Sequence, residues 1–142
     1  MAHDIFFDFY IKASKKDVFD AFTLPDHLNN WWTLKSSGAP LLGTTYNLNF
    51  TDKYDWYAEV SEVEIGTHFY LKMLESDSDW DPTTFGISLE EKDERTLLKF
   101  SHINWPKNNH HYRFSAFCWS QLLLGLKNYV EKGEVVPFEH RS

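Results

Sequence analysis

Five strand-like runs in succession, followed by one long amphipathic helix, constrain the fold of this chain more than any other feature. The runs are rich in β-branched and aromatic residues and are separated by turns too short for a crossover, which favours antiparallel hairpins. They cover residues 43–51, 55–64, 67–75, 83–91 and 95–105. The helix predicted over 109–132 places Trp119, Leu122 and Leu126 on one face, and Gly133 ends it. At about 1.5 Å per residue, such a helix is long enough to cross the sheet.

The segment before these runs predicts one more strand and two short helices. Residues 4–11 alternate in part between polar and apolar side chains, as a strand does. Ser14 can cap a first helix, because apolar residues recur at helical spacing after it. Pro25 suits the first turn of a second helix, which would deliver Trp31 and Trp32 at its end.

The alternation within three of the runs indicates which face of the sheet points toward the terminal helix. Apolar side chains there recur with a period of two and would line a concave face. They are Phe69, Leu71, Met73, Phe85, Ile87, Leu89, Leu98, Phe100 and His102. In the run 55–64, Val60 and Val63 cannot share a face without a β-bulge. The prediction is therefore an α+β fold with a curved antiparallel sheet of about six strands.

The number of aromatic residues predicts a cavity within this fold. A chain of 142 residues suits one domain, 1–142, and it carries six Trp, seven Tyr and twelve Phe. Each of these rings buries ~150–250 Å², more than a core of ordinary size needs in total. Some of the rings should therefore line a binding cavity or lie at the surface.

Charge and cysteine content exclude several classes of function. Fourteen basic and twenty-one acidic residues give a net charge of −7, which would repel a nucleic acid backbone. Lys12, Lys15 and Lys16 form the one basic group, too small to anchor the chain on an anionic membrane. Cys118 is the only cysteine, so no internal disulfide can form. Without a signal peptide or an apolar run long enough to span a membrane, the expected location is cytoplasmic.

Several motifs in this sequence are similar to those of the Aha-type family of the START-like helix-grip superfamily, related to the activator of the heat-shock-protein chaperone ATPase. The similar segments extend over nearly the whole chain. They are Ala13-Ser14, Val18-Phe19-Asp20-Ala21-Phe22, Pro25-Asp26-His27-Leu28, Trp31-Trp32, Gly43-Thr44-Thr45-Tyr46, Thr96-Leu97-Leu98, Ser101-His102, Trp119, Leu122 to Lys127 and Gly133. The resemblance implies a helix-grip fold, with two short helices after the first strand and the long C-terminal helix packed across the concave face. Members of the superfamily include carriers of apolar molecules, polyketide cyclases and co-chaperones.

The candidate ligand-binding residues come from the faces that converge on the predicted cavity. Most are aromatic or aliphatic, and they belong to the helix ends, the concave strands and the N-terminal half of the terminal helix. They are Trp31, Trp32, Trp56, Phe69, Leu71, Met73, Phe85, Ile87, Phe100, His102, Phe114, Phe117 and Gln121. For the two adjacent tryptophans, one ring can pack while the other covers a ligand, or both can be packing residues.

His102 is the one candidate for a catalytic residue. Its position on an apolar face would lower its pKa by desolvation and keep the ring neutral as a base or a ligand contact. The alternative is a core histidine bonded to a backbone carbonyl, since no carboxylate is placed by the sequence to orient the ring.

Other reactive residue types fit poorly to any known site. Cys118 lies in the middle of a helix with no cationic neighbour, which predicts an inert thiol. The run 77–82 resembles the start of a calcium loop but has Pro82 where that loop needs Gly. His110 and His111 are adjacent and so cannot chelate one metal from a helix. We therefore expect neither a metal nor a cofactor.

Three hypotheses for function follow. The first is a binding module whose aromatic cavity holds a small hydrophobic or aromatic molecule. The second, implied by the resemblance and the acidic surface, is a co-chaperone-like protein that stimulates a heat-shock-protein ATPase. The third is a cyclase- or hydrolase-type enzyme that uses His102 as its base. The domain is expected to be a monomer or a homodimer.

Overall fold

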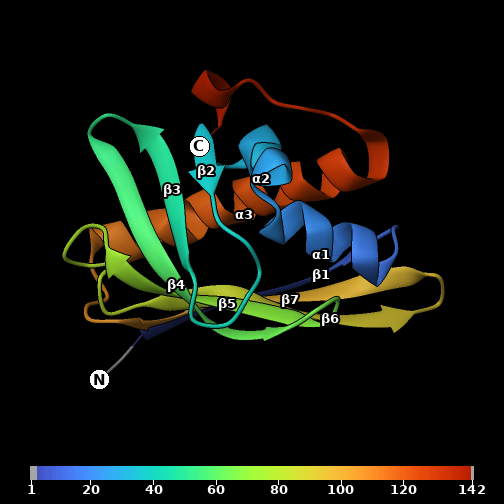
Figure 1. Ribbon diagram of the computed structural model, residues 1–142, viewed down its shortest axis with the longest axis horizontal. Coiled ribbons are helices and arrows are strands. Elements are labelled where there is room, and N and C mark those ends of the chain that lie inside the picture. The colour runs from blue at the N-terminus through green and yellow to red at the C-terminus, as the bar shows by residue number, and fades with distance from the viewer. Residues whose placement is uncertain (1–2, 142) are drawn as a thin grey trace.

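One curved antiparallel sheet carries all three α-helices on its concave side (Figure 1). The computed structural model describes residues 3–141. The strands are β1 (His3–Ile11), β2 (Lys35–Ser37), β3 (Thr45–Thr51), β4 (Tyr54–Glu64), β5 (His68–Glu75), β6 (Thr84–Lys92) and β7 (Arg95–Trp105). The helices are α1 (Lys15–Thr23), α2 (Pro25–Trp31) and α3 (His110–Lys132), followed by a short 3-10 turn, η1 (Phe138–His140).

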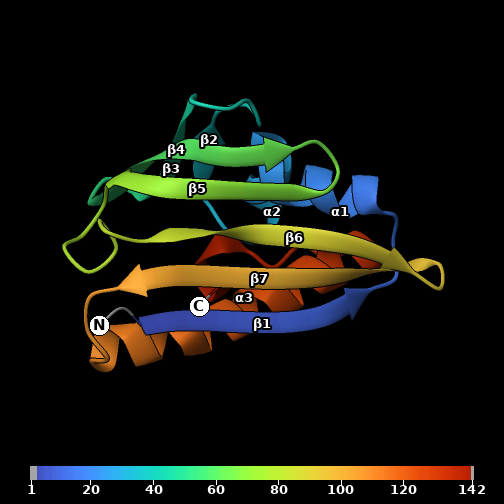
Figure 2. The same cartoon turned by 90° about the horizontal axis from the view of Figure 1, so that it is seen from below.

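The sheet has the spatial order β1-β7-β6-β5-β4-β3-β2. Every neighbouring pair is antiparallel, and Figure 2 shows β1 lying beside β7 at one edge of the sheet. The α+β helix-grip fold is confirmed, with seven strands where about six were expected. The additional strand is β2, whose three residues pair only with β3 and carry no apolar alternation that could predict them.

The helices begin and end where their capping residues lie. Ser14 Oγ accepts a hydrogen bond from the backbone N–H of Asp17 at the start of α1. Pro25 occupies the first turn of α2. Asn109 caps α3, and Gly133 ends it in the left-handed conformation, with φ of 70°. These caps fix both ends of the long helix over the sheet.

The predicted inward-facing residues form the core. Phe69, Leu71, Phe85, Ile87 and Phe100 are all at most 1% exposed. The predicted β-bulge in β4 is present as a register shift between Val60 and Glu62 against β5. It lets Val60 and Val63 both pack against the core, and a bulge of this kind bends its strand and increases the local twist.

The segment after α3 returns over the helices. Arg141 donates a hydrogen bond from Nη1 to the carbonyl oxygen of Thr33 at 3.1 Å, just after α2. Among residues 3–141, no helix is both long and apolar enough to cross a membrane.

Candidate functional site

A cavity of about 400 Å³ opens between the N-terminal half of α3, strands β3 and β4, and the loop 76–83. Most of its lining side chains are aromatic. The lining residues are Trp32, Phe50, Tyr54, Trp56, Asp77, Trp80, His111, Phe114, Ser115, Cys118, Trp119 and Leu122. Its size lies within the range of about 300–1,000 Å³ that is usual for small-molecule sites.

The rings that surround the cavity contact one another in a chain. The Phe50 ring centroid lies 5.3 Å from that of Trp56, and the Trp56 centroid lies 4.7 Å from that of Trp80. Trp32 closes the chain, with centroids 5.4 Å from Phe50 and 5.1 Å from Trp119. Because each ring is held in place by its neighbours, the aromatic wall of the cavity is preformed.

The loop 76–83 brings Trp80 into the wall through a turn held by one carboxylate. Asp77 Oδ1 accepts hydrogen bonds from the backbone N–H groups of Asp79 at 3.0 Å and Trp80 at 2.9 Å. An aspartate that bonds the backbone two and three residues onward stabilises a turn of this kind. Trp80 is thereby only 6% exposed although it belongs to a loop.

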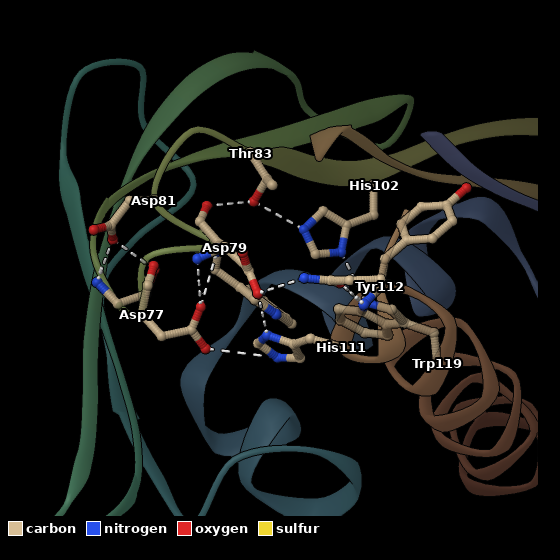
Figure 3. A network of polar contacts seen from close by, with 11 residues as sticks. Asp77, Asp79, Asp81, Thr83, His102, His111, Tyr112 and Trp119 are labelled. Atoms are coloured by element: carbon tan, nitrogen blue, oxygen red, sulfur yellow. Dashed lines mark hydrogen bonds and ion pairs between the residues drawn. The ribbon is translucent and has the colours of Figure 1, made fainter. Parts of the chain in front are cut away.

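His102 lies in the core behind this wall, within a buried chain of hydrogen bonds (Figure 3). Trp119 Nε1–H donates to His102 Nδ1 at 3.0 Å, and His102 Nε2 lies 2.9 Å from Thr83 Oγ1. Since an indole nitrogen can only donate, Nδ1 must be the acceptor and Nε2 carries the proton. The Thr83 hydroxyl in turn donates to the Trp80 carbonyl oxygen at 2.6 Å. The chain therefore joins α3, β7 and the loop 76–83.

This environment keeps the imidazole of His102 neutral. Burial, and to a lesser extent the nearby His111, lowers its pKa from 6.5 to about 3. A base must reach the proton that it removes, whereas both nitrogens of this fully buried ring already have protein partners. The partners differ from the backbone carbonyl that the sequence suggested, but the role they indicate is structural.

A second histidine lies at the edge of the cavity between two carboxylates. Figure 3 shows His111, at the start of α3, next to Asp77 and Asp79. His111 Nδ1 is 3.0 Å from Asp79 Oδ2, and its Nε2 is 3.7 Å from Asp77 Oδ2. The hydrogen bond from His111 holds the pKa of the Asp79 carboxyl below its ordinary value. This cluster attaches the loop 76–83 to α3.

The cavity lining contains one thiol, that of Cys118. Burial raises the pKa of the Cys118 thiol, which leaves it protonated and a poor nucleophile. Within residues 3–141, no group of three or more His, Cys, Asp or Glu side chains could hold a metal ion. What remains is an apolar space with polar groups at one edge.

The structure divides the predicted ligand-binding residues into four groups. Trp32, Trp56 and Phe114 line the cavity. Trp31 and Gln121 line a separate cavity of about 290 Å³ beside the chain's last residues, and the Trp31 indole N–H donates to the Ala21 carbonyl oxygen. The buried core holds Phe69, Leu71, Met73, Phe85, Ile87, Phe100 and His102. Phe117 is 57% exposed and lines none of the described cavities.

Nine of the lining residues are not among the predicted ligand-binding residues: Phe50, Tyr54, Asp77, Trp80, His111, Ser115, Cys118, Trp119 and Leu122. Phe50 continues the inward alternation of Tyr46 and Leu48 in β3, which the sequence shows. Trp80 carried no such signal, because a loop residue has no period to reveal its direction. Its approach to α3 depends on the turn at Asp77.

An antiparallel sheet closed by a long C-terminal helix, with a ring-lined cavity between them, defines the START-like helix-grip class. The family model described as "Activator of Hsp90 ATPase homolog 1-like protein" matches residues 12–131, and the chain belongs to this family. None of the curated proteins matches it.

Solved structures share this fold over nearly the full chain. The Aha1 dimer from Colwellia psychrerythraea is 26% identical, with a TM-score of 0.84 over 93% of this chain and 98% of that one. Protein SSP2350 from Staphylococcus saprophyticus is 20% identical, with a TM-score of 0.79 over 94% and 96%. Protein MLL2253 from Mesorhizobium loti is 17% identical, with a TM-score of 0.79 over 94% and 100%.

Proposed function

We propose that this domain binds a small hydrophobic or aromatic molecule in the cavity between α3 and the β3–β4 side of the sheet. The observation that supports this most is the chain of contacting rings around a space of about 400 Å³. At roughly 25 cal/mol per Å² of apolar surface removed from water, an aromatic guest of modest size gains enough for measurable affinity.

Two phenylalanines on α3 provide a matched pair of variants. Phe114 lines the cavity and is 53% exposed, whereas Phe117 is 57% exposed and lies outside it. Because a carboxylate beside an apolar guest must lose hydration, Phe114→Asp should weaken binding of the uncharged fluorophore N-phenyl-1-naphthylamine by about tenfold. Phe117→Asp adds the same charge to the same helix and should leave the affinity unchanged.

Binding is measured by fluorescence titration, with circular dichroism to confirm that both variants are folded. Four of the six tryptophans, Trp32, Trp56, Trp80 and Trp119, line the cavity and provide an intrinsic signal. Failure to saturate with the native chain, or equal weakening by the two variants, would contradict the proposal.

A co-chaperone-like role is a second candidate, favoured by the family match and by the net charge of −7. An acidic domain that stimulates a heat-shock-protein ATPase should be retained on the immobilised chaperone at low salt and released at high salt, because salt screens exposed charges. The readout is the ATPase rate at both ionic strengths. An unchanged rate together with no retention at low salt would eliminate this role.

A further inference from the structure

The polar edge of the cavity contains a carboxylate that is only partly engaged. Asp77 is the one acidic residue among the lining residues, and its side chain is 36% exposed. Oδ1 accepts the two backbone hydrogen bonds of the turn. Oδ2 lies 3.7 Å from His111 Nε2, which is too long for a direct hydrogen bond.

The orientation of His111 leaves a second acceptor beside this oxygen. Its Nδ1 is at hydrogen-bonding distance from Asp79 Oδ2, 3.0 Å, and a carboxylate can only accept, so Nδ1 carries the proton. In a neutral ring, Nε2 is then a bare acceptor that faces Asp77 Oδ2. Two acceptors at 3.7 Å are complemented by a group with several N–H donors and a positive charge.

The aromatic rings that line the cavity also favour a positively charged ligand. The faces of Trp, Tyr and Phe rings attract a cation within about 6 Å of the ring centre. Tyr54, Trp56 and Trp80 line the same cavity as Asp77, and the ammonium of Lys53 lies 5.9 Å from the Tyr54 ring centroid. An anionic guest would meet these ring faces and the carboxylate together.

The long-range field of the protein adds to this preference. The segment 75–81 carries Glu75, Asp77, Asp79 and Asp81 without a basic residue, in a chain of net charge −7. A cleft with walls of one sign of charge raises the local concentration of oppositely charged ligands.

We propose that the guest of this cavity is an organic cation, with an aromatic or apolar body among the rings and an ammonium group between Asp77 and His111. The inference rests on the proposed function, since it names the chemical class of the molecule that the same cavity holds. It also assigns Asp77 as the residue that selects the charge.

Three probes with the same naphthyl body test the charge directly: 2-(1-naphthyl)ethylammonium, uncharged 1-propylnaphthalene and anionic 3-(1-naphthyl)propanoate. The three probes are compared at pH 8. We expect the ammonium to bind about tenfold more tightly than the uncharged probe, and the carboxylate to bind most weakly. Raising the salt from 20 to 500 mM, measured by calorimetry, should weaken only the ammonium.

Asp77→Asn keeps an Oδ1 acceptor for the turn and removes the charge. It should weaken the ammonium about fivefold and leave the uncharged probe unchanged. Asp81→Asn is the matched control, because Asp81 lies in the same loop, accepts from Ser76 and does not line the cavity. For Asp81→Asn we expect no change in the affinity for either the ammonium or the uncharged probe.

The outcomes separate the two proposals. Saturable binding of the uncharged probe at equal or higher affinity than the ammonium would overturn the charge preference and leave the hydrophobic cavity in place. The absence of saturable binding by all three probes would count against the proposed function itself. A salt-independent ammonium affinity, or an Asp77→Asn variant that behaves like Asp81→Asn, would remove Asp77 from its assigned role.

Discussion

Aromatic residues lie at both ends of the described chain, yet the ring-lined cavity of about 400 Å³ is at one of them. At the packed end, Phe69 of β5 lies against Phe19 and Phe22 of α1 and Tyr46 of β3, with ring centroids 5.5–6.4 Å apart. At the cavity end, the rings of β3, β4 and the loop 76–83 face α3 and Trp32, the residue that follows α2. Helix α1 covers the first set of rings, and Figure 1 shows that it lies on the opposite side of the molecule from the start of α3. Whether a helix covers the rings, and not how many rings there are, therefore decides where a guest can enter.

The sharpest test of this contrast is to truncate one ring at each end. Phe69 is fully buried, so Phe69→Ala should lower the free energy of unfolding by about 3–5 kcal/mol through lost burial and a new void. Phe114→Ala removes a ring that is 53% exposed and should change the free energy of unfolding by less than about 0.5 kcal/mol. Urea denaturation measures both. Similar losses at the two sites would show that the ends are packed alike.

His102 is buried in the core, and its lowered pKa makes the free energy of unfolding depend on pH. Its folded pKa of about 3 lies below the unfolded value of 6.5, so the unfolded chain takes up the proton first. The stabilisation that comes from the neutral His102 ring is complete above pH 6.5 and is lost as the pH falls toward 3. We expect the free energy of unfolding to drop by about 2 kcal/mol between pH 7.5 and pH 5.

Urea denaturation at the two pH values provides the measurement. His102→Asn should start from a lower stability and lose most of this pH dependence. The carboxyls with lowered pKa, Asp55, Asp79 and Glu131, titrate at more acidic pH and contribute little in this window. An equally steep pH dependence in the variant would assign the effect to other groups.

The smallest effect expected is on the reactivity of the one thiol at the cavity end. Cys118 lines the cavity and its pKa is raised by burial, so iodoacetamide should alkylate the native protein several-fold more slowly than the unfolded chain. A bound guest should slow the reaction further, which mass spectrometry can follow over time. An alkylation rate that saturating guest leaves unchanged would place the guest elsewhere.

Sequence periodicity predicted the strands and α3 because each has a repeating contact with the core. The alternation of Leu98, Phe100 and His102 and the helical spacing of Trp119, Leu122 and Leu126 both correspond to buried faces. The bulge in β4 was predictable for the same reason, since Val60 and Val63 break the period of two.

The cavity was harder to predict because periodicity reveals the inward face but not what covers it. Phe85 and Trp56 both point inward, yet only Trp56 reaches the cavity. On α3, neighbouring positions differ by about 100° around the axis, so Phe117 faces away while Cys118 lines the site. The curvature of the sheet, which depends on contacts distant in sequence, and the local turn at Asp77 decide these outcomes.

The hydrogen-bond chain through His102 bears on how a guest gains access. It fastens Trp119 on α3 to Thr83 and the Trp80 carbonyl on the opposite wall. Moving α3 outward would break these hydrogen bonds and leave the buried polar groups without partners, which is unfavourable. A guest should instead enter past Tyr54 and Phe114, two lining rings that are 47% and 53% exposed.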